Sequence, residues 1–285
     1  THYISGPLSI GAVVNSKGQC VLIDSGLNDG YGKRILRIIA GQGLNLKAVI
    51  CTHSHGDHAG ACAFLKKETK AAICASPFES ILLKYPDIEL YNLYSAAPIK
   101  ELEVKFLKPE KVADVRSIKA GKNKLCGMDF EIIPLPGHTM GHIGIVTPDN
   151  ILFLGDAVCP IKIWEKYKLP YFKDIKQSLT TLHMLNHSEF DGYVIGHDGC
   201  HTYDIHEIID YNINGIAVHC RAITEFLVKP ATREQIIDYM IKRYNIPVNI
   251  VQYFLVSSCI SAYLSYLSGE NQIKPGILGD MFVWE

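Results

Sequence analysis

The sequence predicts an α/β protein in which mixed sheets carry helices on their outer faces, followed by a small helical domain. Short apolar runs typical of strands recur as far as residue 197. Segments with apolar residues at helical spacing lie between many of these runs, which indicates sheets covered by helices. The composition shifts after Leu227, where Pro230 breaks a long helix and Thr232 can cap a new one. We therefore expect one domain over residues 1–227 and a second over residues 228–285.

The first strands form a hairpin. Two β-branched runs between Tyr3 and Asp24 flank a polar turn at Asn15–Gly18. The next segment, residues 32–43, has isoleucines at helical spacing and glycines at its end, which predicts a helix. The expected order continues with strand 46–52, helix 60–68, strand 71–75 and helix 76–85, the last with Ser76 as N-cap and Pro77 in its first turn.

The middle of the chain is richer in strands. We expect strands at 130–136, 142–148, 150–156 and 191–197, and helices at 174–187 and 203–227.

The C-terminal region predicts two helices, Arg233–Tyr244 and roughly Val248–Leu267, and then a strand or wing. This order is typical of a winged-helix-like domain. Its acidic and basic residues balance, so a phosphate-binding face is poorly supported and a packing or dimerising module is expected.

Composition sets limits on the function. The 285 residues are 48% hydrophobic and 20% charged with a net charge of -1, which gives no reason to expect nucleic acid as a partner. The apolar run 249–269 is expected to be a packed helix and not a membrane span. Nine cysteines without CxxC pairs favour free thiols, and with no signal-peptide pattern the expected location is the cytoplasm.

Candidate metal ligands cluster in the stretch "CTHSHGDHAG", residues 51–60. His53 and His55 follow a predicted strand and, two residues apart in an extended segment, point to the same side. Asp57 and His58 lie where the next helix begins. Further candidates follow other apolar runs, where a sheet brings side chains to one edge: His138, Asp156 and His197. So many ligand-type residues after buried strands favour a metal site over a solvated histidine-rich turn.

The motifs "LIDSG", "THSHGDHAG", "PGHTMGH", "GDA" and "GHDG" resemble those of the metallo-β-lactamase superfamily, with glyoxalase II and quorum-quenching lactonases nearest in motif wording. The resemblance covers residues 1 to about 227 and implies an αββα sandwich. It implies a first metal bound by His53, His55 and His138, a second bound by Asp57, His58 and His197, and Asp156 bridging the two. Asp24 would be an outer residue that orients the ligand turn, and His142 a supporting residue.

Two divalent ions bring about four positive charges, and two carboxylates with a bridging hydroxide bring about three negative charges. The site would therefore keep a net positive charge and stabilise an oxyanion. We expect the hydroxide to attack a thioester or ester carbonyl, as in glyoxalase II, with Asp57 orienting it as the resemblance implies. The alternatives are a lactonase, and a metal-dependent ribonuclease that uses the C-terminal domain to bind its substrate. Zinc is the expected metal, with iron or manganese as alternatives.

The expected partner is a small-molecule substrate, without nucleic acid or membrane, and a homodimer is left open. Aromatic residues in the segments 157–172, which includes Trp164, and 85–100 could line the substrate pocket, pack at the surface or form a subunit contact. His201 and Tyr203 could reach the substrate from the loop after His197. The remaining histidines, His183, His187, His206 and His219, are expected at the surface or in the core.

Overall fold

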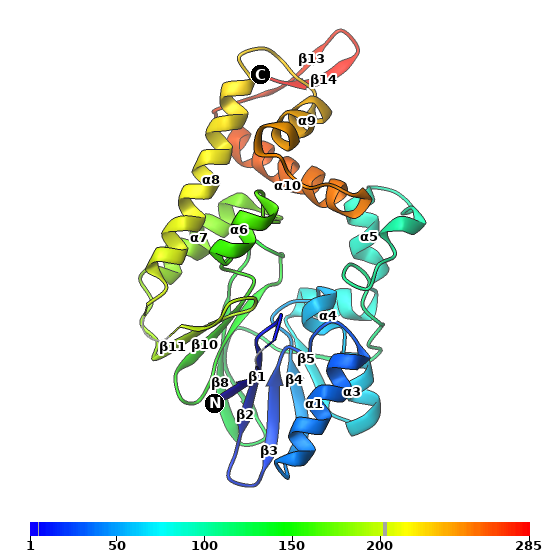
Figure 1. The fold of residues 1–285 in the computed structure, drawn as a ribbon, viewed down its shortest axis with the longest axis vertical. Coiled ribbons are helices and arrows are strands. Elements are labelled where there is room, and N and C mark those ends of the chain that lie inside the picture. Colours follow the sequence, from blue (N-terminus) through cyan, green and yellow to red (C-terminus); the bar gives the residue numbers. More distant parts are fainter. Residues whose placement is uncertain (5, 202–203) are drawn as a thin grey trace. The chain divides into compact units, whose positions relative to one another are not determined.

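The computed structural model describes residues 1–4, 6–201 and 204–285, and its contacts divide it into two compact units (Figure 1). The first unit comprises Thr1–Pro136, Gly141–Ala157 and Ser188–Ile205. The second unit comprises Gly137–Met140, Val158–His187 and His206–Glu285. The boundary expected after residue 227 falls inside the second unit and, as a domain limit, stays a prediction.

One six-stranded sheet of the first unit follows the order of the sequence. Its strands are β1 (His2–Ile4), β2 (Ile10–Val14), β3 (Gln19–Ile23), β4 (Asn45–Ile50), β5 (Ala72–Ala75) and β6 (Val115–Ser117). The pairs β1–β2 and β2–β3 are antiparallel, which confirms the hairpin at the start of the chain. From β3 to β6 the pairs are parallel, so these strands end at one edge.

The other six-stranded sheet has the order β12–β11–β10–β9–β8–β7. Its strands are β7 (Gly121–Leu125), β8 (Met128–Pro134), β9 (Ile143–Val146), β10 (Ile151–Gly155), β11 (Gly192–Ile195) and β12 (Gly199–His201). All neighbours are antiparallel except β10 and β11, which run parallel. The parallel pair brings the segments after β10 and β11 to the same edge of this sheet.

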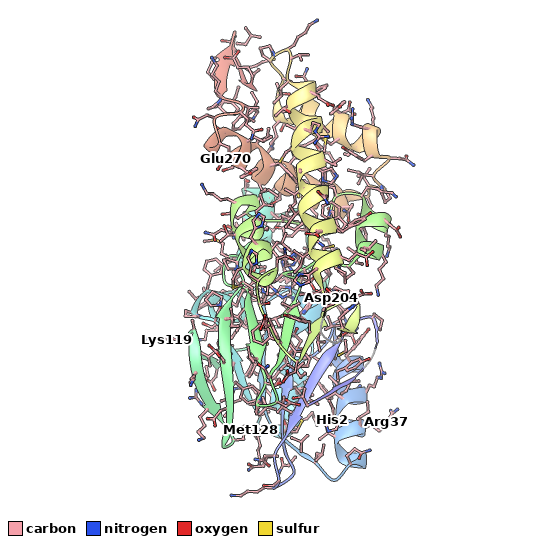
Figure 2. All side chains as sticks on the ribbon, turned by 90° about the vertical axis from the view of Figure 1, so that its left-hand side faces the viewer. His2, Arg37, Lys119, Met128, Asp204 and Glu270 are labelled. Atoms are coloured by element: carbon pink, nitrogen blue, oxygen red, sulfur yellow. The ribbon has the colours of Figure 1, made fainter. Side chains whose placement is uncertain are left out.

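Most helices of the first unit lie beside the first sheet. The helices of this unit are α1 (Asp29–Gly41), α2 (Gly56–Ala59), α3 (Cys62–Thr69), α4 (Pro77–Lys84) and α5 (Asp87–Tyr94), with a short 3₁₀ turn at Lys100–Leu102. α5 packs on α4 instead. α1 begins three residues before the predicted start because Asn28 caps it, its side chain accepting a hydrogen bond from Gly30 N. α1 and α3 pack on each other and on β4, and the exposed Arg37 points away from the sheet (Figure 2).

One core cluster of the first unit joins its two sheets, and a second joins the first sheet to α1 and α3. Ile23 and Ile50 from the first sheet belong to the same buried cluster as Phe130, Ile145 and Phe153 from the second. Burying each such side chain stabilises the fold by about 1.5–3 kcal/mol. The predicted α/β sandwich with mixed sheets is therefore confirmed, and it places the carboxyl ends of β3, β4, β10 and β11 where candidate ligands follow.

The second unit is mainly helical. Its elements are α6 (Ile161–Tyr167), α7 (Ile175–Leu185), α8 (His206–Phe226), α9 (Arg233–Tyr244), α10 (Ile250–Gly269), β13 (Pro275–Leu278) and β14 (Met281–Trp284). Thr232 and Gln235 form a capping box at the start of α9, and Ala231 pairs with Trp284 of the terminal hairpin. The two predicted C-terminal helices are confirmed, and the winged-helix arrangement stays a prediction.

Helix α10 is long and apolar enough, by length and composition alone, to cross a membrane. Within its most apolar stretch 39% of the residues are buried. In the second unit it packs against α9 and α7, and Tyr263 and Leu264 on it are fully buried.

Candidate metal centre

The turn after β4 carries four of the candidate ligands. It bends at Thr52 and His53 and continues to His55, and the buried rings of His53 and His55 have centroids 4.7 Å apart. Asp57 and His58 follow in the short helix α2, and His58 has no exposed surface. The turn is therefore an ordered part of the first unit's interior and not a solvated loop.

Asp24, directly after β3, holds this turn in place. Its carboxylate accepts hydrogen bonds from Thr52 N at 2.8 Å and from the Thr52 hydroxyl at 2.9 Å. It also accepts one from His58 Nδ1 at 2.8 Å. The residue is 2% exposed and adopts a left-handed backbone conformation with φ of 63°. Because β3 and β4 are parallel neighbours, their ends meet at this edge and bring Asp24 to the ligand turn.

Asp156 and His197 follow the parallel strands β10 and β11 of the other sheet. His197 Nε2 lies 3.3 Å from Asp57 Oδ2 and 3.5 Å from Asp156 Oδ2. His58 Nε2 lies 3.1 Å from Asp156 Oδ1. One ligand atom from each of these four residues lies within 4.8 Å of the others. Strand ends from both sheets thus bring together residues that are far apart in the sequence.

Three histidines of the first unit place Nδ1 against an oxygen atom. The pairs are His53 with Thr52 Oγ1 at 3.0 Å, His58 with Asp24 Oδ2 at 2.8 Å, and His197 with the Pro7 carbonyl at 2.8 Å. An imidazole that donates its Nδ1–H keeps the Nε2 lone pair for an ion, and metal-ligating histidines in proteins almost always donate their other N–H in this way. These contacts suit an imidazole that carries a proton on Nδ1, which is the form that binds a metal ion through Nε2.

His138 belongs to the short segment Gly137–Met140, which groups with the second unit. There its Nδ1 lies 3.1 Å from the Tyr171 carbonyl, the same kind of contact that the other histidines make. Its participation as a ligand beside His53 and His55 stays a prediction.

Carboxylates dominate the electrostatics of this edge. Burial disfavours the charged form of His197, but the carboxylates of Asp156 and Asp57 outweigh this effect and raise its pKa to about 12. Burial acts in the same sense on His58, and the carboxylates around it, foremost that of Asp156, raise its pKa to about 10. Burial alone would raise the pKa of Asp156, yet the neighbouring histidines hold it well below the usual range. The negative potential at these atoms favours a cation.

The residues present fit a metal ion. Asp57 Oδ1 is buried and has no hydrogen-bond partner within the described residues. Leaving such an oxygen unsatisfied costs about 1–3 kcal/mol, and coordination to a cation would remove that cost. Imidazole nitrogens and carboxylate oxygens are ligands that zinc binds and that iron and manganese also accept.

Sequence reasoning missed two buried residues that support the ligand turn, Thr52 and Glu79. Thr52 links His53 to Asp24 through its hydroxyl. Glu79 stands in the pattern Ser76-Pro77-Phe78-Glu79, which has the spacing of a helix capping box, and Ser76 Oγ does accept a hydrogen bond from Glu79 N. The carboxylate, however, accepts hydrogen bonds from backbone groups of two distant segments. The capping spacing was the visible signal, and it gave no hint of this second role.

Phe106 was also missed. Its carbonyl accepts a hydrogen bond from Gly56 N at 2.9 Å, which fixes its segment to the ligand turn. Its ring centroid lies 6.1 Å from that of His55, and the residue is 37% exposed. A partly open apolar ring thus stands next to a candidate metal ligand.

Other expectations are settled by burial. Trp164 is 5% exposed, donates a hydrogen bond to Asn212 Oδ1 at 3.1 Å and stacks on His219 at 5.5 Å, all within the second unit. This places Trp164 in the core of that unit and not on a surface open to substrate. His219 is confirmed as a core histidine, 3% exposed, with Nδ1 3.2 Å from the Tyr263 hydroxyl.

The loop after His197 carries two residues expected to reach the substrate, His201 and Tyr203. His201 Nε2 lies 3.1 Å from Asp198 Oδ2, and Tyr203 lies outside the described residues. Their expected contact with substrate stays a prediction.

A family model described as the metallo-beta-lactamase superfamily matches residues 9–197. Among curated relatives, a hydroxyacylglutathione hydrolase of Xanthomonas euvesicatoria pv. vesicatoria is 27% identical over 176 residues, which are 61% of this chain and 56% of the relative. Hydroxyacylglutathione hydrolase GloC of Haemophilus influenzae is 32% identical over 149 residues, which are 49% of this chain and 61% of the relative. The chain therefore spans less than two thirds of the length of these relatives.

Solved structures share the fold. The metallo-beta-lactamase family protein TTHA1429 from Thermus thermophilus superposes with a TM-score of 0.76 at 18% identity, covering 97% of this chain and 93% of that one. TTHA1623 in a di-iron-bound form superposes with a TM-score of 0.52 at 26% identity, covering 71% of this chain and 94% of that one.

Proposed function

Because this chain belongs to the metallo-beta-lactamase superfamily, we propose that it is a metal-dependent hydrolase that cleaves a thioester or ester bond in a small molecule. The observation that carries the proposal is the convergence of ligand atoms from Asp57, His58, Asp156 and His197 within 4.8 Å of one another. The hydroxyacylglutathione hydrolases among its relatives support a thioester as the bond that is cleaved.

The proposed ligand sets follow the motifs. One divalent ion would be held by His53, His55 and His138, and the other by Asp57, His58 and His197. Asp156 would bind both ions. Zinc is the proposed metal. Iron is the alternative that the di-iron form of TTHA1623 supports.

When bound, such ions supply a hydroxide nucleophile at neutral pH and polarise the substrate carbonyl. The chain's own residues make this possible by orientation. Asp24 and the Pro7 carbonyl fix the rings of His58 and His197, so that both Nε2 atoms face the carboxylates of the site. Asp57 Oδ1 is buried without a hydrogen-bond partner among the described residues, so this oxygen is free to hold the proton of the attacking hydroxide. No side-chain nucleophile is required.

Phe106 supports an apolar acyl group in the substrate. Its exposed ring beside His55 offers a non-polar contact, and its backbone cannot move without breaking the hydrogen bond to Gly56. The leaving group is a thiol or an alcohol.

The test is a matched panel assayed with the metal-loaded protein. It contains S-lactoylglutathione, simple acyl thioesters, an acyl-homoserine lactone, a cephalosporin and a single-stranded RNA, each repeated with a chelator and with Asp156→Ala. Chelator-sensitive hydrolysis of a thioester or ester, lost in the variant, is the expected result. Turnover of the lactone alone would select the lactonase alternative, and cleavage of RNA alone would overturn the proposal.

A further inference from the structure

We propose that Glu79 is a positioning residue that fixes the ligand turn of one sheet to the Asp156 strand end of the other, and so sets the metal affinity of the site. This inference rests on the proposed function only in that the site binds metal. Glu79 lies in the first turn of α4 and has no exposed surface. A charged side chain is almost never buried so completely without a specific set of partners.

The partners of Glu79 are backbone amides on both sides of the site. Its Oε2 accepts a hydrogen bond from Ser54 N at 2.9 Å, and its Oε1 accepts one from Gly141 N at 3.1 Å. Ser54 stands between His53 and His55 in the turn after β4. A single carboxylate therefore holds the peptide group that separates two candidate ligands.

The other contact leads to Asp156. Gly141 directly precedes His142, and His142 Nε2 accepts a hydrogen bond from Asp156 N at 3.1 Å. His142 also stacks on His53 with ring centroids 4.9 Å apart. Glu79 is thus connected through two residues, Gly141 and His142, to the backbone of the aspartate proposed to bind both ions.

The close approach requires a glycine at position 141. A Cβ atom there would lie 2.9 Å from Glu79 Oε1, 2.7 Å from Ser76 Oγ and 2.8 Å from Phe78 Cβ, all closer than ordinary contacts. The absence of a side chain at Gly141 lets the carboxylate reach its amide. A substitution at either end should therefore break the same connection.

The first variant is Glu79→Gln, which keeps the size of the side chain. An amide has one acceptor oxygen, so its NH₂ group must face either Ser54 N–H or Gly141 N–H, donor against donor. Charge-assisted hydrogen bonds are about twice as strong as neutral ones, so the remaining bond also weakens. Loss of a residue that orients ligands lowers metal affinity about 10- to 100-fold.

The matched control is Ser80→Ala. Ser80 lies on the same helix, is 5% exposed and donates its hydroxyl to the Pro77 carbonyl at 2.8 Å. This substitution weakens α4 without removing either contact of Glu79. The second variant is Gly141→Ala, alone and combined with Glu79→Gln.

Zinc affinity is measured by competition with a fluorescent chelator, and amide hydrogen exchange of the metal-free protein is measured at Ser54 and Gly141. We expect Glu79→Gln and Gly141→Ala each to bind zinc about 10- to 100-fold more weakly and to exchange both amides faster. Ser80→Ala should bind zinc with unchanged affinity. The double variant should bind zinc no more weakly than the weaker of the two single variants. Unchanged affinity in Glu79→Gln, with zinc bound by the parent protein, would overturn the positioning role and leave the proposed function intact. A parent protein that binds no metal would overturn both.

Discussion

The substitution Asp24→Asn isolates one hydrogen bond of the candidate site. Asp24 uses one carboxylate oxygen for Thr52 N and the other for His58 Nδ1. An asparagine has the same shape and tolerates the left-handed backbone conformation found at this position, so it introduces little strain. What it cannot do is accept from both N–H groups, because only one of its two terminal atoms is an acceptor.

Two orientations of the asparagine are open, and each has a cost. If its oxygen keeps Thr52 N, its NH₂ faces His58 Nδ1 and favours the tautomer with the proton on Nε2, which cannot bind an ion. If its oxygen turns to His58, two N–H donors meet at Thr52. Either way a buried charge-assisted hydrogen bond worth about 1.5–3 kcal/mol is lost, which corresponds to about a 10- to 150-fold weaker metal affinity.

The assay is zinc competition with a fluorescent chelator on Asp24→Asn. The matched control is Asp29→Asn, the same chemical change at an exposed position in the first turn of α1. The control should bind zinc like the parent protein. If Asp24→Asn also binds zinc with unchanged affinity, neither of the two hydrogen bonds of Asp24, to Thr52 N and to His58 Nδ1, sets the metal affinity of the site, and the reasoning is refuted.

Elemental analysis should find about two ions per chain in the parent protein and one or none in Asp156→Ala; an unchanged content would remove Asp156 from the ligand set. Replacing Phe106 by alanine should lower kcat/KM about 5- to 30-fold on bulky acyl substrates through KM, with most of the loss restored by leucine, whereas equal losses on short and long acyl groups would show a purely structural role. Burial lowers the pKa of His219 to about 4, so the folded state binds fewer protons than the unfolded state below pH 6.5. The free energy of unfolding should therefore fall as the pH drops from about 6.5 to about 4, by about 3 kcal/mol at most. Urea titrations followed by tryptophan fluorescence measure this loss, and a His219→Gln variant with the same pH profile would contradict it.

The sequence was most informative at strand ends. Apolar runs followed closely by histidine or aspartate predicted candidate ligands after the ends of strands, and the structure brings Asp57, His58, Asp156 and His197 together. This succeeds because adjacent parallel strands end at the same edge, so local pattern and sheet topology give the same answer.

Several helices, strands and contacts were not predicted from the sequence, for two physical reasons. Helix α5 has weak helical periodicity and exposed aromatics such as Tyr91, so the sequence did not predict a helix here and left pocket lining and surface packing open. Short elements such as α6 and β12 carry too few residues for a period to stand out. Glu79 and Phe106 accept hydrogen bonds from backbone N–H groups of the ligand turn, which is far from both in the sequence. Such contacts depend on the tertiary path of the chain, which the spacing of residues does not encode.

Strand ends from both sheets converge on one set of ligand atoms, so an ion bound there would join distant parts of the chain as a disulfide does. An ion that binds only the folded chain stabilises it by about 4 kcal/mol when its free concentration is about a thousand times its Kd. The supply of metal would then set how long this protein survives proteolysis, as well as how fast it works. Shortage of the metal would lower the amount of folded protein along with its activity.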